Sequence, residues 1–180
     1  MEAIIKLIVE MVGKLINTQC STPHTGVEYN NMAQDKVLET PNLKDGYYEW
    51  KKGEIKPINK YFNTREFTCQ CTLKDCVEQK ISKDLIDILV KIREYHQKPM
   101  TITSGFRCEA HQANLKKGGA NTVVATKSQH CLGNAADALF KDLRINEWIN
   151  TARTHSMSVG VATNFIHIDT RRDKKREWSY

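Results

Sequence analysis

The sequence lacks an apolar run of the roughly 20 residues that a membrane-spanning helix needs. Charged residues recur at every fourth position along its most apolar stretch, residues 3–16, beginning just before it with Glu2 and continuing with Lys6, Glu10 and Lys14. These charges also break the uninterrupted apolar core that a secretory signal peptide requires. The spacing instead predicts an amphipathic N-terminal helix that could bind a partner protein or a larger assembly.

Internal repeats and low-complexity tracts are also absent from the sequence. Acidic residues are in the minority, since 27 Lys and Arg stand against 21 Asp and Glu, for a net charge of +6. A basic protein can bind nucleic acid, anionic lipid or an anionic wall polymer, and charge alone does not choose among them. Much of the excess lies in residues 171–177, which we interpret as a solvated tail.

Residues 17–46 are mainly polar, with Pro, Gly and Asn but no sustained apolar period, which is typical of a linker. We therefore divide the chain into residues 1–46, an amphipathic helix and polar linker, and residues 47–180, a single catalytic domain. The length of 180 residues and the 40% apolar content suit a folded domain of ordinary size.

Apolar periodicity predicts both helices and strands in the second part. We expect helices at about residues 82–96, 109–117 and 143–152, and strands at 100–104, 134–140 and 165–169. The first helix should bury one face, formed by Leu85, Ile88, Leu89, Ile92 and Tyr95. These elements predict an α+β fold, with a small, mostly antiparallel sheet flanked by helices.

One strand carries a carboxylate, Asp137, among alanines, and a buried carboxylate needs a cationic partner. His130 lies seven residues earlier, and Gly133 could turn the chain between them. His167 lies on another predicted strand. Two His and one carboxylate are a common catalytic zinc set with an open fourth position. Spacing alone also allows another interpretation, in which His130 and His167 are core or surface residues without a metal and Asp137 caps a turn.

Three ordered sequence blocks resemble a known family. SQHCLGNAAD at 128–137 is similar to the SxHxxGxAxD signature of zinc D-Ala-D-Ala carboxypeptidases and L-alanyl-D-glutamate endopeptidases. SGFRCEAHQ at 104–112 and FIHIDTR at 165–171 resemble two further blocks of that family, and YFNTREFTCQC at 61–71 resembles its entry segment. The resemblance covers about residues 61–178.

This resemblance implies that one zinc ion per chain is bound by His130, Asp137 and His167, and that Arg107 contacts the substrate or the oxyanion. It implies hydrolysis of an amide bond next to a D-amino acid in bacterial peptidoglycan, by a carboxypeptidase or an endopeptidase. Such an enzyme acts outside the cytoplasm, so release by lysis, carriage in a phage particle or another export route is expected. We expect a peptidoglycan peptide as substrate, no nucleic-acid partner and no membrane span.

The sequence departs from the family at Asn164, where many relatives carry an acidic general base three residues before the last zinc ligand. An amide cannot accept the proton from water. Asp169 could replace that base, or it could orient His167 and pair with Arg171. Asn164 also favours the alternative of a non-catalytic zinc-containing binding module, like the hedgehog signalling domain. The stretch at 115–127 is longer than the family's usual loop.

Cysteines form a separate cluster. Cys69, Cys71 and Cys76 lie close together in sequence, and Cys108 follows the SGFR turn. The four could form a second zinc site or two disulfides, and their spacing matches no standard zinc ribbon. His111 and His155 lie on predicted helices, and we interpret them as packing or surface residues.

Overall fold

The computed structural model describes residues 39–115, 127–141, 144–155, 158–171, 173–174 and 176–180. The expected N-terminal helix and most of the long stretch at 115–127 lie outside the described residues. Among the described residues, no helix is long and apolar enough to cross a membrane.

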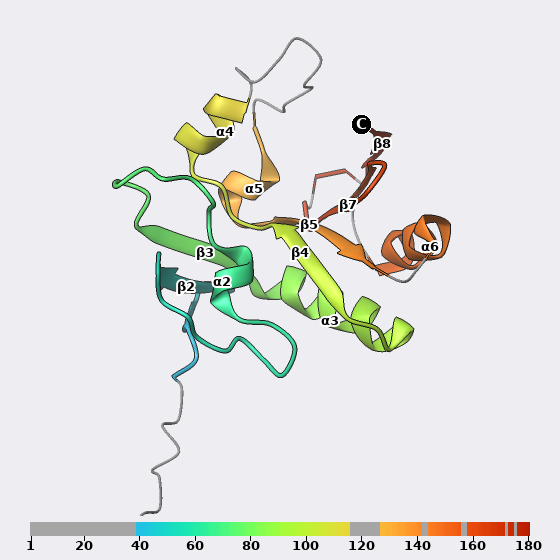
Figure 1. Cartoon of the computed structure of the whole chain (residues 1–180), viewed down its shortest axis with the longest axis horizontal. Coiled ribbons are helices and arrows are strands. Elements are labelled where there is room, and N and C mark those ends of the chain that lie inside the picture. The colour runs from blue at the N-terminus through green and yellow to red at the C-terminus, as the bar shows by residue number, and fades with distance from the viewer. Residues whose placement is uncertain (1–38, 116–126, 142–143, 156–157, 172, 175) are drawn as a thin grey trace, which may run out of the picture. The chain divides into compact units, whose positions relative to one another are not determined.

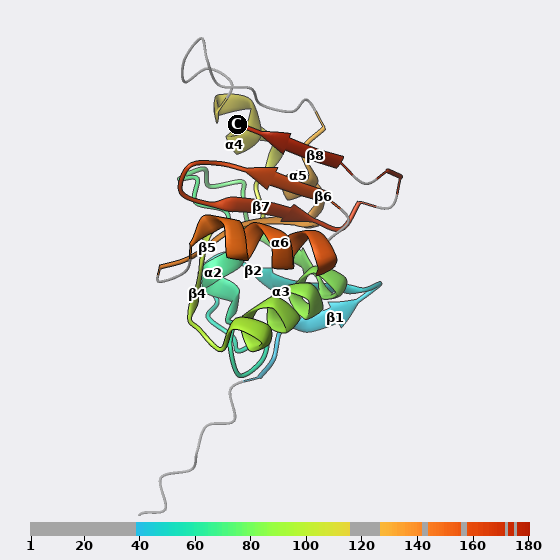
Figure 2. The same ribbon diagram turned by 90° about the vertical axis from the view of Figure 1, so that its right-hand side faces the viewer.

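Two sheets and five helices make up the described part of the chain (Figures 1 and 2). An antiparallel sheet contains β1 (Asn42–Lys44), β2 (Tyr47–Lys51) and β3 (Glu78–Ser82). A second sheet has the order β4 (Met100–Ser104), β5 (Ala135–Phe140), β7 (Ile166–Asp169), β6 (Ser158–Val161), β8 (Arg176–Ser179). The helices are α2 (Thr64–Phe67), α3 (Lys83–His96), α4 (Glu109–Leu115), α5 (Gln129–Leu132) and α6 (Ile145–His155).

The expected α+β class, with a mostly antiparallel sheet, is confirmed. Every pairing in the two sheets is antiparallel except that of β6 with β8, which is parallel. Strand β1 lies at the end of the stretch that the sequence predicts as a linker.

The two faces of the five-stranded sheet have different roles. Alternation along β5 and β7 sends Ala136, Ala138, Ile166 and Ile168 into the apolar core. Helices α3 and α6 cover this face and contact each other (Figure 2). The intervening residues of the same strands, among them Asp137, point to the opposite face. The fold thus holds polar side chains on a rigid sheet backed by the core.

Helix α3 confirms the helix expected at 82–96, and it begins after Ser82 and ends at Gln97, whose φ is 51°. Its buried face differs from the expected set at more than one position, and Ile88 is only partly buried. Ile86 is buried at 1% exposure, whereas Tyr95 is 71% exposed. Tyr95 lies in the last turn, where its ring meets the edge of His96 instead of the core.

The interpretation of the basic C-terminal segment as a solvated tail is wrong for its second half. Residues Arg176–Ser179 form β8, which pairs with β6. Arg176 and Glu177 are exposed, so the charges do face solvent. The segment is nevertheless fixed, because the ring of Trp178 packs beside His167, with 5.2 Å between ring centroids.

Candidate metal centre

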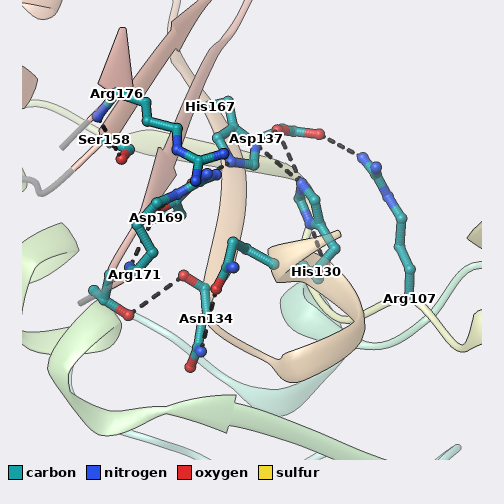
Figure 3. Close-up of polar contacts among 12 residues, drawn as sticks. Arg107, His130, Asn134, Asp137, Ser158, His167, Asp169, Arg171 and Arg176 are labelled. Atoms are coloured by element: carbon teal, nitrogen blue, oxygen red, sulfur yellow. Dashed lines mark hydrogen bonds and ion pairs between the residues drawn. The ribbon is translucent and has the colours of Figure 1, made fainter. Parts of the chain in front are cut away.

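Three side chains from separate elements converge on one point (Figure 3). Asp137 on β5 and His167 on β7 are register partners across neighbouring strands. His130 comes from α5, the short helix that precedes β5. Asp137 Oδ1 lies 2.8 Å from His167 Nδ1 and 3.3 Å from His130 Nε2, and the two nitrogens are 3.1 Å apart.

Glycine at position 133 makes this convergence possible. Gly133 has a φ of 75°, a left-handed conformation that ends α5 and leads the chain into β5. A Cβ at this position would also lie 2.9 Å from the carbonyl oxygen of Lys80. The tight turn therefore depends on a residue without a side chain, as the sequence predicts.

The donor set fits a zinc ion. For bonds of 2.0–2.1 Å in a tetrahedral site, neighbouring ligand atoms are about 3.3–3.4 Å apart. The three observed separations, 2.8, 3.1 and 3.3 Å, lie close to this value. All three residues are buried. Two imidazoles and one carboxylate leave a fourth position open to water or substrate.

The outer nitrogen of each histidine is held by a second partner. His130 Nδ1 donates to the carbonyl oxygen of Gly105 at 2.6 Å. His167 Nε2 lies 3.2 Å from Asp169 Oδ2. These contacts orient both rings so that His130 Nε2 and His167 Nδ1 face Asp137. Such outer contacts are typical of metal-binding histidines.

Burial and charge act in opposite directions on the pKa values of this cluster. Burial lowers the pKa of His130. It would also lower the pKa of His167, but hydrogen bonds to Asp137 and Asp169 outweigh it and raise that pKa. Burial favours a higher pKa for Asp137, yet the nearby His130 and His167 hold it well below its usual range. Asp137 is therefore an anion, as a metal ligand must be.

Arg107 binds the other oxygen of the same carboxylate. Its Nη2 lies 2.5 Å from Asp137 Oδ2, and its Nε donates to Ser104 Oγ at 2.9 Å. The backbone N–H of Arg107 also donates to the carbonyl oxygen of His130 at 3.2 Å. Arg107 thus contacts a candidate ligand directly, while its side chain remains 17% exposed.

Asp169 lies behind His167, on the far side from Asp137. It is fully buried, and its carboxylate forms hydrogen bonds with the backbone and the guanidinium of Arg171 (Figure 3). Burial favours a higher pKa for Asp169, but the hydrogen bonds from His167 and Arg171 lower it to about 2. This geometry favours the alternative in which Asp169 orients His167.

A family model for Peptidase M15 matches residues 60–169, more than half of the chain. The chain belongs to the peptidase M15 family. A comparison with curated proteins finds no match. The M15 match spans all three candidate ligands, and it agrees with the resemblance read from the sequence blocks.

A pocket opens beside Asp137 and Arg107 in this M15 domain. Its other lining residues are Gln70, Thr103, Ser104, His111, Leu115, Leu139, Asn164 and Phe165. Among these described lining residues, Asp137 is the sole carboxylate. Asn164 is exposed at the pocket, where it offers an amide.

Sequence reasoning missed the roles of several site residues. Ser104 and Gly105 lie in one of the family-like blocks, but the sequence does not show that the Ser104 hydroxyl accepts from Arg107 or that the Gly105 carbonyl accepts from His130. His111, interpreted as a packing or surface residue, lines the pocket and places Nδ1 3.2 Å from Cys69 Sγ. The resemblance of three ordered sequence blocks to a known family predicted the ligands, but only the fold shows which residues surround them.

Proposed function

We propose that this M15 peptidase is a zinc enzyme that hydrolyses an amide bond next to a D-amino acid in bacterial peptidoglycan stem peptides. The observation that carries the proposal is the convergence of His130, Asp137 and His167 beside a pocket. The peptidoglycan substrate rests on the resemblance of the sequence blocks to wall carboxypeptidases and endopeptidases. Such a substrate places the site of action outside the cytoplasm.

Each residue of the centre has a role in this chemistry. A zinc ion bound there would polarise the scissile carbonyl and lower the pKa of the attacking water towards about 7. Gly105 and Asp169 hold the two histidines in the orientation that binding requires. Arg107 fixes Asp137, and its partly exposed guanidinium can also meet a substrate carboxylate or the developing oxyanion.

The charge of the pocket suits a stem peptide. Such peptides carry free carboxylates, and Arg107 is a permanent cation at the pocket lining. A carboxypeptidase would use this cation for the terminal carboxylate of its substrate. An endopeptidase would use it for a side-chain carboxylate or for the oxyanion alone.

Digestion of purified peptidoglycan tests the proposal. The zinc-loaded full chain should release fragments whose masses identify the cleaved bond, and a chelator should abolish the release. Loss of a terminal D-alanine would indicate a carboxypeptidase, and loss of larger stem fragments an endopeptidase. The variant with His130→Ala and His167→Ala is the matched control. Absence of any fragment from the zinc-loaded native chain would refute the enzymatic proposal.

A second candidate function is a non-catalytic zinc-containing binding module. The observation that favours it is Asn164, together with the absence of a second carboxylate among the described pocket residues. General acid and base groups are normally needed for amide hydrolysis. This candidate predicts zinc-dependent retention on peptidoglycan in a pull-down without any released fragment.

A further inference from the structure

A second group of potential metal ligands is separate from the one formed by His130, Asp137 and His167. We infer that a second zinc ion is bound by four thiolates, those of Cys69, Cys71, Cys76 and Cys108. The four sulfur atoms lie within 4.8 Å of one another. They come from the segment between α2 and β3 and from the turn between β4 and α4. This site is independent of the proposed function.

The separation between the Cys71 and Cys108 sulfurs matches tetrahedral metal ligation and not a disulfide bond. Zinc–sulfur bonds of 2.3 Å place the sulfurs of a tetrahedral site about 3.8 Å apart. Cys71 Sγ and Cys108 Sγ are 3.7 Å apart. A disulfide needs a separation of about 2.05 Å. The described cysteines are all free thiols in the structure.

Each of the four sulfurs has its own N–H donor. The donors are Cys108 N to Cys69 Sγ, Lys52 Nζ to Cys71 Sγ, Gln79 Nε2 to Cys76 Sγ and His111 N to Cys108 Sγ, each at 3.4 Å. A neutral thiol is a weak hydrogen-bond acceptor and does not need an N–H donor. The presence of one donor at every sulfur therefore favours thiolates. Donors around every sulfur stabilise thiolates and are the outer contacts expected of a metal site.

Charge and burial also suit a closed structural site. Four thiolates around Zn²⁺ carry a net charge of −2, which the Lys52 ammonium next to Cys71 partly offsets. Cys69 and Cys76 are buried, and Gln79 is buried beside them. Structural zinc sites use four protein ligands in this way and leave no open position.

The position of this cluster explains what it does for the fold. It joins the 69–76 segment to the turn that carries Arg107. Just before that segment, the end of α2 meets the same turn at Gly105, where an added Cβ would lie 2.5 Å from Phe67 Cα, and Phe106 N donates to Phe67 O at 2.8 Å. Few apolar side chains hold the 70–75 stretch, so a bound metal would supply the cross-link.

Cobalt substitution of the full native chain tests the inference directly. Co²⁺ bound by thiolates gives an intense sulfur-to-metal charge-transfer band in the near ultraviolet, and the histidine centre has no sulfur ligand. We expect this band, and a zinc content of about two per chain after zinc loading under reducing conditions. A cobalt-loaded chain without the band would overturn the inference.

Variants separate the two centres. With His130→Ala and His167→Ala, the charge-transfer band should remain and zinc should fall by about one per chain. With Cys71→Ser and Cys108→Ser, the band should disappear, whereas Cys131→Ser, outside the cluster, should keep it.

If the double cysteine variant does not fold, titration of the native chain with a mercurial tests for the second site instead. The reagent should release one zinc ion as four thiols react. Four thiols that react at once without zinc release, or a native mass lower by two hydrogens per disulfide, would contradict the second site. Failure of peptidoglycan digestion leaves these readouts unchanged.

Discussion

Asp137 and His167 are direct partners across two antiparallel strands, and their side chains meet at 2.8 Å on the face opposite the core. In a strand the two faces alternate residue by residue, so a slip of one position would send both side chains into the core. The apolar residues on either side of each ligand prevent such a slip. The core therefore sets the register that the metal centre needs.

Removal of the histidine ligands should remove one metal ion. Replacing His130 and His167 together by Ala leaves one carboxylate, which cannot hold zinc tightly by itself. Metal analysis should show a loss of about one zinc per chain relative to the native protein. His155→Ala, on the end of α6, is the control and should change nothing. An unchanged zinc content in the double variant would show that the assignment of this centre is incorrect.

Arg107→Ala should reduce turnover by about a hundredfold, because a lost oxyanion or carboxylate partner has this effect. The melting temperature of the zinc-loaded protein should change little, since zinc and two histidines still compensate Asp137. The metal-free variant should melt at a lower temperature than metal-free native protein, because Asp137 has lost its guanidinium partner.

Arg107→Lys keeps the charge but loses the planar fork, so it should recover only part of the activity. Steady-state kinetics and thermal melts with and without chelator measure these effects. If the zinc-loaded Arg107→Ala variant melts at a lower temperature but keeps full turnover, Arg107 has only a structural role.

Asp169→Asn should weaken zinc binding by about 10- to 100-fold, as is typical when the outer partner of a metal-binding histidine is lost. Turnover at saturating zinc should be close to native, because Asp169 contacts the nitrogen of His167 that faces away from Asp137. Asp173→Asn changes an exposed carboxylate nearby and is the control. Loss of most turnover with zinc still bound would instead identify Asp169 as the general base.

Asn164→Asp should distinguish the enzyme from the binding module. Asn164 lies at the pocket, so the variant introduces a carboxylate there. If the native chain hydrolyses peptidoglycan with an adequate base of its own, the variant should change turnover by less than about tenfold. Thr163→Asp places the same charge on the neighbouring exposed residue and is the control. A strong gain of activity from an inactive native chain would support the binding module.

Much of the fold and of the ligand set could be predicted from the sequence. The helix at 83–96 and the strands at 100–104, 135–140 and 166–169 have clear apolar periods, and the structure confirms them. Alternation separated His167 from Ile166 and Ile168, whereas Asp137 was singled out as the one polar residue of an otherwise apolar strand. Periodicity works here because these elements each bury one face against a common core.

The first sheet was not predicted, for a physical reason. Strands β2 and β3 read YYEWK and EQKIS, and neither alternates cleanly between apolar and polar residues. Gln79 is buried in β3 because its amide is satisfied by the backbone of Cys69 and Cys76. A polar residue whose hydrogen-bond partners are backbone groups of a folded loop gives no sign of burial in the sequence.

Gly160 on β6 contributes no functional atom, yet the site requires a residue without a side chain at this position. A Cβ there would lie 2.5 Å from the indole of Trp178, the same ring that packs beside His167. Even alanine would push that ring away from the sheet and loosen the wall of the metal centre. In a saturation mutagenesis screen, position 160 should therefore be sensitive to substitution even though glycine supplies no ligand and no catalytic group.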